Sequence, residues 1–490
     1  MRQTARARRR FATGRASSIS IANSEVILGK IAADLARFHI TIMFMPEAPP
    51  AKAAAAADVD ERSRIRGMVR SLRHRNFQLF FSGQLISLIG TWMQTIAQSW
   101  LVYRMTGSSL LLGTVAFAGQ IPVFLFAPVG GMVADRWNRR RIVIATQTTA
   151  MILALVLAFL TLTKRVTVGE IMLLASLMGI VNAFDIPTRQ AFLVEMVGRE
   201  DLMNAIALNS SMFNGARIIG PAIAGILVAG IGEGWCFFSN GVSYIAVIAG
   251  LLLMRMPAWQ RQREMAPPFE HIAEGFRFVR DTAPIRALLL LLGLVSLVAM
   301  PYSVLMPIFA AHILHGNART LGTLMGATGA GALGATLLLA LRRGVRGLGR
   351  WVAIASGAFG VFLILFSLSR WYILSVILLV PAGFAMMTQM ASSNTLIQVM
   401  VPDRLRGRVM AVYSMMFMGM APLGALLSGA MAQRIGAPWT LGSGGAVAIV
   451  GAIVFARHLP KIRVEARQLI VAQGLAGGDP AQEMNAPPVS

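Results

Sequence analysis

Long runs of hydrophobic residues, broken by short polar and basic segments, fill most of this 490-residue chain. A helix needs about 20 mostly apolar residues to cross the core of a bilayer. On that length we predict twelve transmembrane helices, at about 77–103, 109–134, 141–162, 168–197, 202–230, 235–256, 285–310, 320–342, 351–368, 371–400, 409–433 and 437–457. The longest internal loop separates the sixth from the seventh. The pattern predicts an all-α membrane protein with twelve transmembrane helices in two six-helix halves.

A short pattern of apolar residues and glycines recurs at a constant offset of 204 residues. Residues 210–215 (SSMFNG) match residues 414–419 (SMMFMG). Glycines recur at the same offset in three pairs: Gly179 and Gly383, Gly220 and Gly424, and Gly225 and Gly429. Such a repeat indicates two structurally similar halves, which in a membrane protein are typical of a transporter that binds its substrate at their interface.

The composition indicates that lipid, not water, is the solvent of this chain. It is 56% hydrophobic and 13% charged, with a mean hydropathy of +0.64. On a soluble protein its net charge of +24 would indicate nucleic-acid binding. However, the loops on one side of the predicted spans hold only six of the 45 Lys and Arg residues: Arg104, Lys164, Arg165, Arg319, Arg370 and Arg434. By the positive-inside rule we expect a multi-pass protein of a bacterial inner membrane, with both termini cytoplasmic and no nucleic-acid partner.

The polar segments divide the chain into five parts. Residues 1–67, rich in Arg and Ser at their start, are expected to be a disordered extension. Residues 68–256 and 285–458 are the two predicted halves. Between them, residues 257–284 have apolar positions at helical spacing and predict an amphipathic helix along the cytoplasmic interface. Residues 459–490, rich in Ala, Gly and Pro, are expected to be a disordered tail.

Residues that could hold a metal or a cofactor are scarce. Cys236 is the single cysteine, the six His show no metal-ligand spacing, and we find no glycine-rich nucleotide loop. We therefore expect no metal, no cofactor and no enzymatic activity. The expected partners are a small-molecule substrate, protons and the lipid bilayer, and the chain is expected to be a monomer.

The loop after the second predicted span combines small, acidic and basic residues in the order GGMVADRWNRRR, from residue 130 to 141. It resembles the motif G-x-x-x-D-R-x-G-R-R of the major facilitator superfamily, carried here by Gly131, Asp135, Arg136, Arg139 and Arg140. The resemblance implies the fold of that superfamily and a cytoplasmic gate built from these residues. Asn138 replaces the second glycine of the motif. Because Asn tolerates a positive φ, we expect the same turn.

The fifth predicted span resembles the Gly-Pro motif of exporters in the same superfamily. The motif falls on Gly215, Gly220, Pro221 and Gly225, with Ala216 and Ala224 in place of glycines. Proline bends the helix, and small residues permit close helix crossing. The resemblance favours export, although helix packing alone would also account for these residues.

Charged side chains lie near mid-membrane depth in the fourth and fifth predicted spans. Asp185 and Arg189 are four residues apart and share a helix face; Arg217 lies at similar depth, and Glu195 lies nearer the cytoplasmic end. Buried charges in a membrane are costly unless they are paired or face water. Either Asp185 binds and releases a proton while Arg189 or Arg217 holds its charge or binds an anionic substrate, or the pair is a permanent salt bridge.

Uncharged polar side chains within the spans could line a substrate cavity or hydrogen-bond neighbouring helices. The cavity candidates are Gln94, Gln98, Asn182, Asn209, Asn214, Gln389 and Asn394.

Together these patterns favour a secondary active transporter that exports a small amphipathic molecule, a drug or a siderophore, from the cytoplasm by proton antiport and alternating access. The segments 182–190 and 406–410 also resemble the enterobactin-exporter branch of the superfamily. The alternatives are a lipid flippase or lysophospholipid transporter, and a non-transporting membrane sensor or scaffold.

Overall fold

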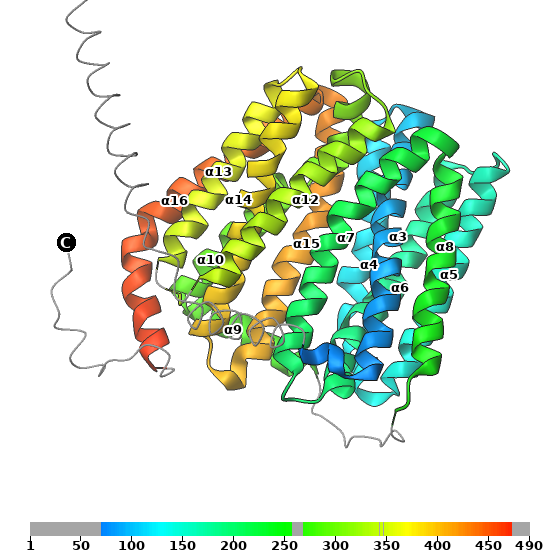
Figure 1. Cartoon of the computed structure of the whole chain (residues 1–490). Coiled ribbons are helices and arrows are strands. Elements are labelled where there is room, and N and C mark those ends of the chain that lie inside the picture. The colour runs from blue at the N-terminus through cyan, green and yellow to red at the C-terminus, as the bar shows by residue number, and fades with distance from the viewer. Residues whose placement is uncertain (1–69, 257–267, 343, 346, 473–490) are drawn as a thin grey trace, which may run out of the picture. The chain divides into compact units, whose positions relative to one another are not determined.

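The computed structural model describes residues 70–256, 268–342, 344–345 and 347–472, and this part of the chain contains helices and no strands (Figure 1). A 3-10 turn, η1 (Arg70–Arg73), leads into the first half: α3 (Arg75–Thr106), α4 (Ser109–Arg136), α5 (Arg139–Leu162), α6 (Val168–Val197), α7 (Leu202–Ile231) and α8 (Glu233–Leu253). Helix α9 (Pro268–Asp281) precedes the second half: α10 (Ala283–Val298), α11 (Tyr302–Ile308), the π-helical η2 (Phe309–Ile313), α12 (Ala318–Leu341), α13 (Leu348–Leu368), α14 (Tyr372–Met400), α15 (Asp403–Ile435) and α16 (Ala437–Ala472). The predicted extension 1–67 lies outside the described residues.

Eleven helical stretches of the described chain are long and apolar enough to cross a membrane, with α10 to η2 counted as one stretch. The stretch that corresponds to the first predicted span, α3, has 32 residues but a more polar sequence. It packs between α7 and α8 and turns glutamine, serine and threonine side chains toward the interior of the bundle. The all-α membrane class predicted from the sequence is therefore confirmed.

The paired glycines of the sequence repeat mark equivalent helix contacts in the two halves. Gly179 of α6 packs on α4, and Gly383 of α14 packs on α12 in the same way. A Cβ atom at either position would lie 2.0–2.4 Å from a backbone oxygen of the neighbouring helix. Small residues let two helix backbones approach this closely in a membrane. The repeat thus reflects two halves whose helices pack in the same way.

Two further glycine pairs join the halves to each other. A Cβ atom on Gly322 of α12 would lie 2.4 Å from the carbonyl oxygen of Pro221 and 3.0 Å from Gly225, both on α7. In the equivalent crossing of α15 with α4, a Cβ atom on Gly429 would lie 2.6 Å from the carbonyl oxygen of Ser109 and 2.9 Å from Gly113. The repeated sequence therefore forms the interface between the halves.

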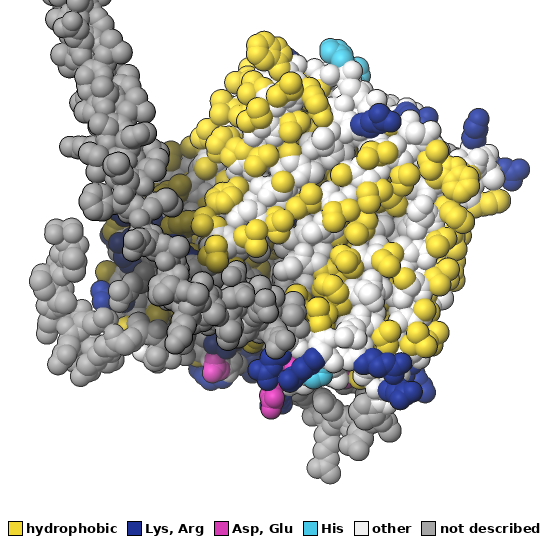
Figure 2. Space-filling view, viewed as in Figure 1, with side chains coloured by type: hydrophobic (Ala, Val, Ile, Leu, Met, Phe, Trp, Pro, Cys, Tyr) yellow, Lys and Arg dark blue, Asp and Glu magenta, His cyan; other side chains and the backbone are white. Residues whose placement is uncertain are grey.

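Basic side chains gather along the lower end of the bundle in Figure 2, and others lie at its upper end, with a wide band of hydrophobic side chains between the two ends. We call the lower end the basic face; there α4, α6, α12 and α14 end, and α5, α7, α13 and α15 begin. The opposite end, the far face, holds the start of α4 at Ser109 and of α12 at Ala318. Both glycine crossings between the halves involve these starts, so the halves meet tightly from the far face to about mid-depth.

Helix α9 falls within the predicted linker 257–284 and docks on the second half. Glu274 forms ion pairs with Arg408 and, at 3.7 Å, with Arg404, both on α15. Gly275 allows this contact, because a Cβ atom there would lie 2.8 Å from the carbonyl oxygen of Arg408. Helix α9 is thereby held on the second half at the basic face.

Two helix termini differ from the sequence expectations. Asn138 has a φ of −62°, so the expected positive φ is wrong; its side chain instead accepts a hydrogen bond from the backbone N–H of Arg141 (3.1 Å) and caps α5, a role that favours extended backbone. Helix α16 continues past Pro460 to Ala472, into the segment 459–490 expected to be disordered. The continuation packs its apolar residues, among them Ile462 and Leu469, against the hydrophobic core.

Candidate functional site

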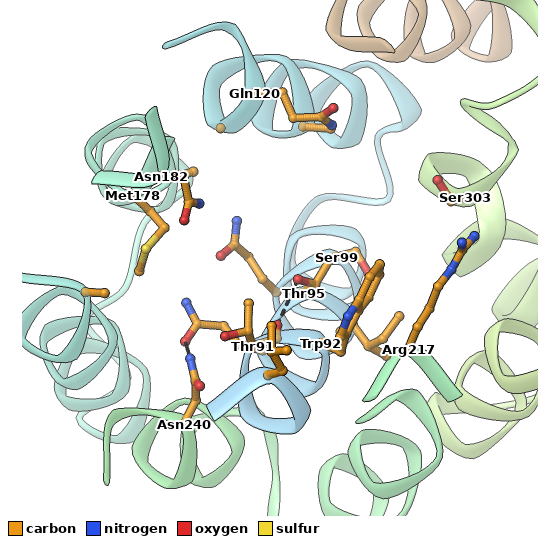
Figure 3. A pocket seen from close by; sticks show the side chains of 18 of the residues that line it. Thr91, Trp92, Thr95, Ser99, Gln120, Met178, Asn182, Arg217, Asn240 and Ser303 are labelled. Carbon is orange, nitrogen blue, oxygen red and sulfur yellow. Dashed lines mark hydrogen bonds between the residues drawn. The ribbon is translucent and has the colours of Figure 1, made fainter. Parts of the chain in front are cut away.

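A cavity of about 630 Å³ lies between the two halves (Figure 3). Its polar side chains come mainly from the first half: Gln84, Ser87, Thr91, Gln94, Thr95, Gln98, Ser99, Gln120, Gln147, Asn182, Asp185, Arg189, Asn214, Arg217, Asn240 and Tyr244. The second half contributes a mostly apolar wall: Met300, Tyr302, Ser303, Val304, Met325, Met387, Met390 and Phe417. The volume suits a drug-sized molecule, and the two walls suit an amphipathic one.

Asp185 of α6 is the buried acid of the polar wall, and its side chain is 3% exposed. One carboxylate oxygen accepts hydrogen bonds from the Thr146 hydroxyl (2.8 Å) and the Gln147 amide (2.9 Å) of α5. The other oxygen lies 2.6 Å from Nε of Arg189, one helical turn away. Both oxygens are thus satisfied, and Arg189 keeps 22% of its side chain exposed toward the cavity.

Arg217 of α7 is the second arginine of the lining, and its surroundings differ from those of Arg189. Its guanidinium lies 5.8 Å from the ring centre of Trp92, over the ring, and 3.9 Å from the sulfur of Met386. Among the described residues, no carboxylate pairs with it. Gly220 permits this arrangement, because a Cβ atom there would lie 2.5 Å from Cβ of Trp92. Figure 3 shows Arg217 extending beside Trp92 toward Ser303 of the second half.

The predicted cavity residue Gln94 of α3 is joined to α8 by a hydrogen bond. Gln94 accepts a hydrogen bond from the amide of Asn240 (2.7 Å), a side chain that is 1% exposed. Gln98, Asn182 and Asn214 also line the cavity. The sequence analysis missed Asn240, although an isolated amide in an apolar span was the same signal that selected the other candidates.

Three predicted cavity residues lie elsewhere. Asn209 sits on the part of α7 nearer the basic face and is absent from the lining. Gln389 is 1% exposed inside the second half, where neither atom of its amide has a hydrogen-bond partner. Asn394, also on α14, hydrogen-bonds Gln398 one turn away. The period of a helix alone did not show which face of α14 meets the cavity.

The residues of the predicted gate motif form a small charged network at the basic face. Arg139 lies 2.6 Å from Glu195 and 3.5 Å from Asp135, and its Nε donates to the carbonyl oxygen of Ala134 (3.0 Å). Arg140 donates to the carbonyl oxygens that end α8, at 2.8 and 3.0 Å. Arg136 and Asp135 are exposed. The motif thus ties α4, α5, α6 and α8 together and leaves one acid facing outward.

The glycines of the two motifs have unequal roles in this structure. A Cβ atom on Gly131 or Gly215 would meet no atom within 4 Å, whereas Gly130 is pressed against the carbonyl oxygen of Ala183. In the Gly-Pro motif, Gly220 and Gly225 are the close-packed positions, and the Pro221 carbonyl lies at the crossing with α12. Close approach, the property that glycine supplies, is therefore used at Gly220 and Gly225 and not at Gly215.

A second buried acid, which the sequence analysis missed, lies in the loop before α7. Asp201 is 2% exposed and accepts a hydrogen bond from the ring of His74 (2.7 Å); it also pairs with Arg70 (2.9 Å) and Arg73 (2.8 Å). The His74 hydrogen bond and the two arginine charges hold the pKa of Asp201 below its usual value, against the opposing effect of burial. This cluster fastens η1 to the junction of α6 and α7.

The sequence matches one family of membrane proteins and is similar to transporters of siderophores and drugs. A family model described as transmembrane secretion effector matches residues 67–476. The staphyloferrin A transporter of Staphylococcus aureus is 26% identical over 379 residues, covering 77% of this chain and 94% of that protein. The enterobactin exporter EntS of Escherichia coli is 26% identical, with 73% and 85% covered. The multidrug efflux pump Tap of Mycolicibacterium fortuitum is 28% identical, with 71% and 87% covered.

Solved structures of transporters share the fold. The nucleoside transporter NupG superposes with a TM-score of 0.60 at 15% identity, over 79% of this chain and 98% of that one. A bacterial homologue of the lysosomal transporter Spinster, inward-facing and unoccupied, gives a TM-score of 0.58 at 15% identity, over 81% and 98%. These likenesses confirm the predicted two-half fold.

Proposed function

The chain belongs to the transmembrane secretion effector family of the major facilitator superfamily, and on this premise we propose that it exports a siderophore or a drug-like small molecule from the cytoplasm by alternating access. The observation that carries the proposal is the 630 Å³ cavity between the halves, with its polar and its methionine-rich wall. Two relatives, an enterobactin exporter and a multidrug efflux pump, support the direction, and together with the staphyloferrin A transporter they support the substrate range.

We place the basic face in the cytoplasm, by the positive-inside rule, with both termini there and the chain in a bacterial inner membrane as a monomer. On this orientation the glycine crossings of α7 with α12 and of α4 with α15 close the periplasmic side. The structure then corresponds to the inward-facing state, in which a substrate enters the cavity from the cytoplasm.

The gate motif supports a switch between inward- and outward-facing states. Arg139 bridges Asp135 and Glu195 within the first half, and Asp135 keeps 59% of its side chain exposed. When the cytoplasmic side closes, an exposed carboxylate at this place is available to basic groups of the second half, such as those that begin α15. The network would thus stabilise the closed cytoplasmic gate.

We assign the coupling role to Asp185 and propose proton antiport. In this structure Arg189, Thr146 and Gln147 satisfy the carboxylate, so proton binding requires Arg189 to leave it, as a change of state would allow. The permanent salt bridge predicts instead that the pair persists in every state. These two roles differ in their response to the loss of the acid.

The coupling role is tested with Asp185→Asn in proteoliposomes. We expect substrate exchange to continue without a proton gradient while gradient-driven efflux is lost, because Asn cannot bind and release a proton. Asp403→Asn, an exposed acid at the start of α15, is the control. Gradient-driven efflux by a folded Asp185→Asn variant would remove Asp185 from the coupling mechanism.

The export function is tested in a strain that lacks the gene. We expect either lower siderophore in the medium under iron limitation or greater sensitivity to at least one amphipathic drug, with both reversed by the wild-type gene. Unchanged siderophore and unchanged sensitivity across the panel would contradict export of these two classes. Altered lipid distribution without either effect would point to the flippase alternative.

A further inference from the structure

We infer that the cavity selects anionic substrates and that Arg217 is the group that binds their negative charge. The charged side chains of the lining are Asp185, Arg189 and Arg217, so the lining carries an excess of one positive charge. Asp185 and Arg189 neutralise each other at 2.6 Å. The excess charge therefore resides on Arg217.

The depth of Arg217 makes this charge significant. It lies near the middle of α7, roughly 22 Å from each end at about 1.5 Å per residue. An arginine at this depth is costly unless it has a counter-ion or faces water. The described chain supplies an aromatic ring and a thioether there, and no carboxylate. A substrate anion is the counter-ion that would remove this cost.

The contacts of Arg217 orient it for that task. The guanidinium lies over the Trp92 ring at 5.8 Å, and no carboxylate of the described residues occupies its N–H groups, whose fork matches the two oxygens of a carboxylate. Trp92 is held in turn by an edge-to-face contact with Phe213, with ring centres 5.6 Å apart. The methionines of the opposite wall supply adaptable apolar contact. The cavity thus suits a carboxylate joined to an apolar or aromatic body.

An anionic substrate also fits the energetics of export. A membrane potential that is negative inside drives anions outward. The inference rests on the proposed export through this cavity, and it does not depend on proton exchange at Asp185.

Three probes of one shape separate the charge from the apolar body: 1-naphthoate, the neutral 1-naphthamide and the cation 1-naphthylmethylammonium. With the full-length protein in lipid nanodiscs, calorimetry should show naphthoate bound most tightly. Arg217→Gln should weaken naphthoate binding by about tenfold or more, the effect of one charged hydrogen-bonding group, and leave naphthamide binding unchanged. Arg217→Lys should recover part of the loss.

The matched control is Arg434→Gln, which removes an exposed arginine at the far face and should change neither affinity. Unchanged naphthamide binding also shows that Arg217→Gln is folded. The inference is overturned if the wild type fails to bind naphthoate or binds the ammonium as tightly, or if Arg217→Gln binds naphthoate with wild-type affinity.

Uptake of the same probes into inside-out vesicles separates this inference from the proposed function. Charge-selective binding without uptake would contradict export through the cavity and leave the anion site standing. Uptake of the ammonium but not of the carboxylate would uphold export and overturn the anion site.

Discussion

The two halves share one packing scheme but carry different chemistry at equivalent positions. Asp185 and Arg189 of α6 correspond, at the 204-residue offset, to Gln389 and Ser393 of α14, and Arg217 of α7 corresponds to Ala421 of α15. The ionic residues of the first half line the cavity, whereas Gln389 and Ser393 are buried and lack hydrogen-bond partners. The repeat therefore specifies helix packing, whereas the charged side chains of the cavity lining come from the first half alone.

The largest effect, loss of transport, is expected at the two glycine crossings, where the halves pack in the same way. Gly322→Val and Gly429→Val each place side-chain carbons where a backbone oxygen lies within 2.4–2.6 Å of the new Cβ atom. Each valine must then separate its own crossing, so we expect loss of transport, and labelling from the periplasmic side of a cysteine introduced in the cavity lining at Ser303. A valine at Gly131, where no atom lies within 4 Å, should leave the labelling unchanged. If only one of the two valine substitutions changed transport and labelling, the two crossings would differ in their importance for closure.

The second-largest effect is a difference in stability between a variant of α6 and a variant of α14. Arg189→Met leaves Asp185 buried beside two neutral hydrogen-bond donors, and breaking a buried pair on one side costs about 3 kcal/mol or more. Gln389→Met removes an amide that has no partner, so it should be neutral or slightly stabilising. Thermal unfolding in one detergent measures both variants. Equal destabilisation would show that the two sites are energetically alike.

The smallest effect, a change in Tm, is expected for Asp201, which precedes α7, and Asp403, which begins α15. Asp201 is 2% exposed with three basic partners, whereas Asp403 is exposed and pairs with Arg406. Asp201→Asn should lower the Tm, while Asp403→Asn, which breaks a surface pair, should hardly change it. Because folding lowers the pKa of Asp201, its contribution to stability is present above the ordinary pKa of about 4 and disappears as the pH falls through the lowered value.

Measurement of Tm at neutral and at acid pH tests this direction of the pH dependence. The difference between the wild type and Asp201→Asn should be greatest at neutral pH and shrink in acid. A difference that grew on acidification would show that the cluster stabilises the protonated carboxyl.

Much of the candidate site followed from single residues in apolar spans. Asp185, Arg189, Arg217, Gln94 and Gln98 attracted attention because each is costly in lipid, and all five line the cavity. Gln389 carried the same signal and lies inside the second half. Cost in lipid shows that a side chain must avoid lipid, but it does not show whether the side chain meets a cavity or the protein core.

The sequence by itself determined the membrane class, the two halves and the glycine positions at which helices cross. These properties follow from local hydrophobicity and from a repeat that any reader of the chain can align. Tertiary structure alone decided that Asp185 is paired with Arg189, Thr146 and Gln147, while Arg217 has an aromatic ring and, within the described part of the chain, no acid beside it. Side chains far apart in the sequence become neighbours only when helices pack, so the charge of the cavity is a property of the assembled bundle.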